Sequence, residues 1–234
     1  MSDLFGMITQ QVHGSIATRY DQLYPGLEAD GSVHFSSYDG AVAGPIAIRG
    51  ATWSRELMSL DSLNLRVSQA TDWRYFDVSL YVTDARIVIV VDKPIDARTK
   101  WVGHLRYPWL HSVGYRPRQG ILYDCELVLG MEQLQEGREM PTDCTLRLLL
   151  DRHDDSAELA REIVRRLARH HLGRGTLPAS AVPEFQVLLD PPRLPDPTKG
   201  THATYWLGAF KHCPTGTEYV RGQPEQGIWR GSKV

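Results

Sequence analysis

The chain has 234 residues, of which 42% are hydrophobic and 23% are charged, a balance that is ordinary for a globular protein with a sizeable core. Its formal net charge of −2 argues against a general nucleic-acid binder, because such proteins are normally basic overall. No apolar run approaches the roughly 18 residues of a membrane span, and the first residues, MSDLFGMITQQ, lack the regions of a secretory signal. We therefore expect a cytoplasmic protein with no specific nucleic-acid partner.

Residues 1–45 are predicted to form an N-terminal appendage that consists of a helix and a loop. Four apolar residues recur there at helical spacing: Leu4, Met7, Ile8 and Val12. Ser2 or Asp3 is a suitable N-cap for this helix. Turn residues at Asp39-Gly40 and Gly44-Pro45 then mark the end of the appendage.

Residues 46–174 are predicted to form the main domain, which is α+β with mainly antiparallel strands. Six strand-like segments follow one another, at residues 74–83, 85–92, 100–107, 110–115, 120–130 and 142–151. In the first of them, Val78, Leu80 and Val82 alternate with polar residues, as in a strand that is buried on one face. The continuous run of β-branched residues at 87–91 instead indicates a strand that is buried on both faces or lies at the centre of a barrel.

The last two segments, 120–130 and 142–151, are the best hairpin candidate, although their connection is too long to fix a register. Cys125 and Cys144 are predicted at core-facing positions of this hairpin. A disulfide between them requires that the register place them opposite each other, and a reducing cytosol disfavours it. Small buried thiols are the simpler interpretation.

A helix at residues 156–172 is predicted to close the domain. Asp155 is its candidate N-cap, Glu158 completes a pattern like a capping box, and Gly173 is the expected end. One face is apolar, and the other carries four arginines: Arg161, Arg165, Arg166 and Arg169. Two interpretations of these arginines stay open. They form either a solvated face that pairs with neighbouring glutamates or a patch that faces an anionic partner.

Residues 175–234 are predicted to form a proline-rich linker and an aromatic tail. Four aromatic residues of the tail are candidates for contact with a partner: Tyr205, Trp206, Phe210 and Trp229. Aromatic side chains that a short segment cannot bury often mark a protein contact. The alternative is that they pack on the chain's own domain.

Two motifs and the closing helix resemble those of bacterial pleckstrin-homology-like domains, especially the GRAM-like branch. The first motif is Tyr-Val-Thr-Asp-Ala-Arg-Ile-Val-Ile at residues 81–89, and the second is His-Leu-Arg-Tyr-Pro-Trp-Leu-His-Ser-Val at residues 104–113. The resemblance covers residues 74–172 and implies a seven-stranded, partly open barrel capped by a C-terminal helix, with Arg86 in a structural role. Members of this family bind phosphoinositides, peptides or other proteins, and most have no catalytic activity. The chain lacks the cluster of lysines and arginines that lipid-binding members carry around their first hairpin.

Motifs that carry catalysis or metal binding are missing from the sequence, which has no GxSxG, P-loop, GxGxxG or CxxC pattern. Asp154 and Asp155 are explained by their place at a helix N-terminus, and His170 by its place at a helix C-terminus. We therefore expect a non-enzymatic module that docks another protein, without metal or cofactor. Peripheral association with an anionic membrane is the alternative, and an unrecognised enzyme is a third hypothesis.

Overall fold

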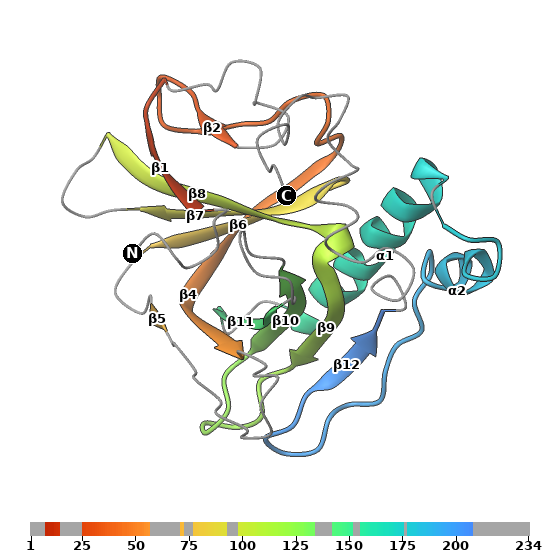
Figure 1. Ribbon diagram of the computed structural model, residues 1–234. Coiled ribbons are helices and arrows are strands. Elements are labelled where there is room, and N and C mark those ends of the chain that lie inside the picture. The colour runs from red at the N-terminus through yellow and green to blue at the C-terminus, as the bar shows by residue number, and fades with distance from the viewer. Residues whose placement is uncertain are drawn as a thin grey trace, which may run out of the picture.

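A computed structural model describes residues 8–14, 25–56, 71–72, 77–92, 98–133, 142–151, 155–175 and 177–207 (Figure 1). Its strands are β1 (Ile8–Val12), β2 (Gly26–Leu27), β3 (Val33–His34), β4 (Val42–Glu56), β5 (Thr71–Asp72), β6 (Val78–Thr83), β7 (Arg86–Asp92), β8 (Thr99–Arg106), β9 (Leu110–Arg116), β10 (Glu126–Gln133), β11 (Thr142–Leu150) and β12 (Ala203–Trp206). Its helices are the 3-10 turn η1 (Tyr107–Trp109), α1 (Ser156–Arg174) and α2 (Val182–Val187). These elements confirm the expected class, which is α+β and mostly antiparallel β.

One large antiparallel sheet dominates the fold, in the order β1-β8-β7-β6-β4-β11-β10-β9-β12. The long strand β4 holds its two halves together, because the first part of β4 pairs with β6 and the remainder pairs with β11. Ile48 lies where the two pairings meet, opposite Val78 on one side and Leu150 on the other. Strands β8 and β9 are consecutive in the chain but are not neighbours in the sheet, which is therefore not closed.

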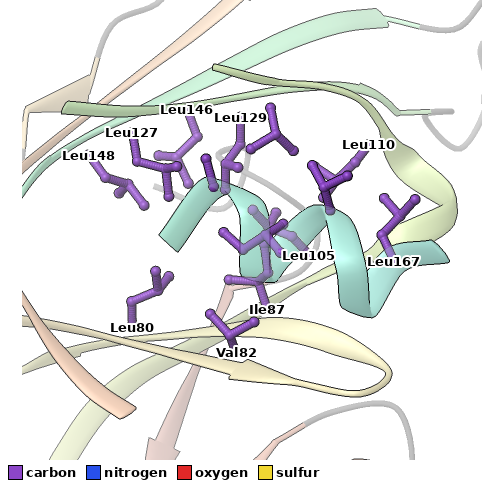
Figure 2. Close-up of a cluster of buried hydrophobic side chains, with 14 of the residues drawn as sticks. Leu80, Val82, Ile87, Leu105, Leu110, Leu127, Leu129, Leu146, Leu148 and Leu167 are labelled. Carbon is purple, nitrogen blue, oxygen red and sulfur yellow. The ribbon is translucent and has the colours of Figure 1, made fainter. Parts of the chain in front are cut away.

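Helix α1 packs beside β9, β10 and η1, at the side where β8 and β9 part (Figure 1). The apolar stripe predicted for this helix is buried there, including Ile163, Val164 and Leu167. Figure 2 shows inward side chains of the surrounding strands gathered around the helix, among them Leu105 and Leu129. The expected closing helix is thus confirmed, and its burial supplies much of the apolar contact that stabilises the open side of the sheet.

The two-sided burial predicted for residues 87–91 is confirmed in β7. Ile87, Ile89 and Val91 belong to the main core, between the sheet and α1. Val88 and Val90 point to the opposite face, where they form a second cluster with Leu27 of β2 and Val102 of β8. The β2–β3 hairpin therefore covers the outer face of the sheet at this strand.

The helix predicted in the N-terminal segment is wrong at residues 8–12, which form β1. This strand pairs antiparallel with β8, with Gln10 opposite Trp101. A helix this short is marginal by itself, so pairing with an available sheet edge outweighs the local periodicity. Residues 1–7 and 15–24 lie outside the described part of the chain. Because residues 25–41 contribute to the second core cluster and to a buried ion pair described below, the described part of 1–45 belongs to the main fold.

The prediction that a linker follows residue 174 is also wrong for residues 177–207. Residues 177–207 contain α2 and β12, and both pack on the rest of the fold: Phe185 of α2 is fully buried, and β12 adds to the edge of β9. Helix α1 also runs to Arg174, past the predicted stop at Gly173, because Gly175 adopts the left-handed conformation (φ 62°) that ends it. Its N-terminus is as predicted, since the Asp155 carboxylate accepts hydrogen bonds from the N–H groups of Ala157 and Glu158.

The predicted hairpin is confirmed as β10–β11, and its register answers the question of a disulfide. Cys144 lies opposite Met131, whereas Cys125 precedes β10 and its carbonyl accepts a hydrogen bond from the N–H of Leu150. The two cysteines therefore sit at opposite ends of the hairpin, too far apart for a bridge. Residues 120–125, predicted as the start of this strand, instead form a turn, because Gly120 has a φ of +67° and Gln119 bridges to Tyr123.

Candidate functional site

Two arginines of the predicted α1 face are held by acidic side chains of the same helix. Arg161 pairs with Glu158 at 2.9 Å and also donates from Nε to the carbonyl of Pro191 at 3.2 Å. Arg165 pairs with Glu162, and both side chains are half-buried. These contacts favour the interpretation of a solvated face in which charge is balanced locally.

The other two arginines of this face differ from each other. Arg166 is largely buried and acts as a brace: it pairs with Glu162 at 2.6 Å and Asp84 at 3.1 Å, and it donates to the carbonyl of Ala41. Arg169 is exposed. The structure therefore does not gather the four arginines into one anion-facing site, and the membrane alternative requires a different surface.

The most buried charges of the described chain surround Arg86. Its guanidinium is fully buried and binds Asp39 in bidentate fashion, Nε to Oδ1 at 2.7 Å and NH2 to Oδ2 at 2.8 Å. Its NH1 group lies 2.9 Å from Nδ1 of His104, and because a guanidinium only donates, Nδ1 is the acceptor. Burial, with help from Arg86 and Arg106, holds the pKa of His104 well below its ordinary value, so this ring is neutral.

This cluster fixes the turn between β6 and β7. Thr83 Oγ1 accepts hydrogen bonds from the N–H groups of Ala85 and Arg86, and the carboxylate of Asp39 reaches the same turn from the segment before β4. Arg86, Asp39 and His104 are all buried, so these described side chains act within the fold and do not face solvent. The resemblance implied a structural role for Arg86, whereas no sequence signal pointed to its partner Asp39, which is 47 residues away in the chain.

In the histidine pair at the end of α1, His171 is buried and His170 is partly buried. Burial is the main cause that lowers the pKa of His170 to about 3 and that of His171 to about 4, with smaller effects from neighbouring cations. His171 packs against Phe185 of α2, with ring centroids 5.1 Å apart. Among the described residues, no cluster of three or more histidine, cysteine, aspartate or glutamate side chains is arranged to hold a metal ion.

The aromatic residues of the tail are divided by strand alternation in β12. Tyr205 is 5% exposed and donates to the carbonyl of Pro192 at 2.8 Å, whereas Trp206 is 76% exposed. Phe210 and Trp229 lie outside the described residues. The sequence identified both β12 aromatics, but only pairing with β9 decides which side chain faces the core and which faces solvent.

Within the described ranges, one side of the β12 backbone pairs with β9 and no strand pairs with the other side. Leu207 N–H donates to the carbonyl of His111 at 2.9 Å, and in the register of this pair Tyr205 lies opposite Val113. In an antiparallel ladder, alternate residues direct their backbone groups toward the partner strand, so those of Thr204 and Trp206 point away from β9. Among the strands that the structure describes, β12 is the last on its side of the sheet. The sheet thus ends in a strand that carries outward N–H and C=O groups and one large exposed aromatic side chain.

Comparison with known proteins adds no relative: no protein-family model matches the chain, and no curated protein matches its sequence. In the part of the chain that the structure describes, no helix combines the length and apolar character needed to cross a membrane.

Proposed function

We propose that the chain is a non-enzymatic docking module, built on a pleckstrin-homology-like barrel, that holds an extended segment of another protein along the free edge of β12. The barrel part of the proposal rests on the resemblance of residues 74–172 and is supported by strand order. The stretch β8-β7-β6-β4-β11-β10-β9 has seven strands, the number that the resemblance implies, although β4 precedes residues 74–172; α1 packs beside β9 and β10.

The observation that carries the docking proposal is the combination of Trp206 and the outward backbone of β12. An unpaired strand edge is a template for a further strand, and backbone hydrogen bonds then supply affinity. Tryptophan is the residue type most enriched among side chains that dominate protein interfaces. A side chain of this size that is 76% exposed on an edge strand therefore favours a protein partner.

The partner expected for this edge is an extended peptide segment with an apolar residue that covers the Trp206 ring. Strand pairing needs no particular side chains on the partner, so specificity depends on that contact and on the groups around it. The arginines of α1 play no part in this proposal, because Arg161, Arg165 and Arg166 are already engaged within the chain.

The test compares two variants of the edge with the wild type in affinity capture from the native cell, with the full chain as bait. Thr204→Pro removes one outward N–H and leaves the β12–β9 hydrogen bonds in place, since proline is tolerated on edge strands. Trp206→Ala removes the aromatic anchor. Each variant is expected to weaken capture of the same protein by about tenfold or more.

The matched control is Val187→Ala, which shortens an apolar side chain that is 63% exposed on α2. It should capture the partner as the wild type does. The proposal would be contradicted if the wild type captured no protein, or if all three variants captured the same protein as strongly as the wild type does.

A further inference from the structure

The loop that joins β9 to β10 presents two large aliphatic side chains to solvent. Ile121 is 91% exposed and Leu122 is 72% exposed, and they are adjacent in the chain at the tip of the loop. Scattered exposed aliphatic residues are common on protein surfaces, but a neighbouring pair at a protruding tip is a concentrated apolar surface. This surface is separate from the β12 edge of the proposed function.

Hydrogen bonds hold the loop that carries this exposed tip in place. The backbone N–H of Gln119 donates to the carbonyl of Tyr123 at 3.1 Å and closes the turn. The Gln119 side chain donates to the carbonyl of Pro197 at 3.0 Å and accepts from the N–H of Gly200 at 2.9 Å. The tip is thus fastened to the segment 197–200 at the same end of the molecule, below β12 in Figure 1. Ile121 and Leu122 point outward because this turn is fixed.

Two exposed cations lie on the loop and on the segment that braces it. Arg118 is exposed and donates from Nε to the carbonyl of Gly120 at 3.0 Å, and Lys199 is exposed on the segment that braces the loop. Neither side chain has an acidic partner within the described ranges. The acidic side chains nearby are matched by other cations: Asp124 by Arg49, Glu126 by Arg116 and Arg147, and Asp196 by Arg193.

Asp151 is exposed and also near the base of the loop, because Leu150 is hydrogen-bonded to Cys125. Among the described residues named here, the cations still outnumber the acids, although the whole chain has a net charge of −2. The apolar tip and its basic surroundings therefore form a locally distinct surface, which we call the tip surface: Arg118, Ile121, Leu122 and Lys199.

We propose that the tip surface contacts an anionic lipid bilayer, with Ile121 and Leu122 entering the boundary between headgroups and acyl chains, and Arg118 and Lys199 at the level of the lipid phosphates. Apolar burial together with attraction to anionic lipids is how peripheral proteins bind a membrane surface. A convex tip of two aliphatic residues suits a fluid bilayer, which needs no complementary pocket. A protein partner is less favoured, because leucine is under-represented among side chains that dominate protein interfaces.

The test is sedimentation of the full chain with phosphatidylcholine vesicles, with and without phosphatidylserine, at low and at high salt. The wild type should pellet with anionic vesicles, most strongly at low salt. Ile121→Ser/Leu122→Ser should reduce the partition coefficient by about tenfold for each side chain, which corresponds to about 1.4 kcal/mol each. Arg118→Gln/Lys199→Gln should weaken binding to anionic vesicles and flatten its dependence on salt.

Val187→Ser is the matched control, because it also makes an exposed aliphatic residue polar, but on α2. It should bind vesicles as the wild type does, and thermal melting should show that all variants are folded. The proposal is overturned if the wild type does not pellet with anionic vesicles at low salt, or if the Ile121/Leu122 variant binds them equally well. Loss of a protein partner in that variant, without vesicle binding by the wild type, would reassign the tip to a protein contact. Thr204→Pro should leave vesicle binding unchanged, so this result is independent of the β12 proposal.

Discussion

At the scale of single residues, the Asp39–Arg86 pair shows how the fold depends on groups that are distant in sequence. Both side chains are fully buried, and the pair joins the segment before β4 to the turn between β6 and β7. Removing one partner of a buried ion pair leaves the other charge uncompensated, which costs far more than the intact pair contributes. The pair is therefore the point at which a single substitution should damage the fold most.

We expect Asp39→Ala to lower the free energy of unfolding by about 3–5 kcal/mol, because the Arg86 guanidinium remains buried without its carboxylate. Chemical denaturation measures this change. The control is Asp190→Ala, which removes a carboxylate that is 92% exposed and 3.6 Å from Arg161. That variant should stay within about 0.5 kcal/mol of the wild type. A loss of under about 1 kcal/mol in Asp39→Ala would show that the ion pair does not brace the fold.

At the scale of elements, His171 joins the end of α1 to its neighbours. Its ring packs against the ring of Phe185 in α2 and donates a hydrogen bond to the carbonyl of Tyr107 in η1. Burial and Arg174 lower the pKa of His171 to about 4, below the ordinary value of 6.5. The unfolded chain therefore binds a proton before the folded chain does, so stability is complete above about pH 6.5 and falls as the pH drops toward 4.

For His171→Asn, which keeps a donor for the Tyr107 carbonyl but does not titrate, we expect a flatter dependence of stability on pH. Between about pH 7.5 and about pH 5, the wild type should lose about 2 kcal/mol more than the variant. Urea unfolding at the two pH values gives the comparison. His104 and His170 also have lowered pKa values because of burial, so the variant should still lose some stability. Equal losses in both proteins would mean that His171 is protonated or exposed in the folded state.

The elements that sequence predicts correctly are those whose signal is local. Alternation in β6, the β-branched run in β7 and the capped apolar stripe of α1 each follow from residues a few positions apart. Strands β1 and β12 have no such signal, because their form depends on the remote edges of β8 and β9. The candidate site on β12 also depends on a remote contact. The sequence points to Tyr205 and Trp206 as a pair, but only the pairing with β9 buries Tyr205 and exposes Trp206.

At the scale of the whole molecule, burial is concentrated between the bent sheet and α1, with a smaller cluster under β2. Charged groups are either paired within this frame, as around Arg86, or balanced on its surface, as along α1. Within the described residues, the two surfaces that we propose for recognition are the outer edge of β12 and the apolar tip at Ile121 and Leu122. Both surfaces come from segments that follow β9 in the chain, the loop to β10 and the strand β12 that pairs with β9. They are about 80 residues apart in sequence, so no one local motif contains both.

The most direct measurement of the central claim is hydrogen exchange of every backbone amide, in the free chain and in complex with the captured partner. In the free chain, the amides of Thr204 and Trp206 should exchange much faster than those of Tyr205 and Leu207, which face β9. In the complex, Thr204 and Trp206 should become protected, and the inner strands should change little. Protection of these two amides before any partner is added, or no change when the partner binds, would contradict the account.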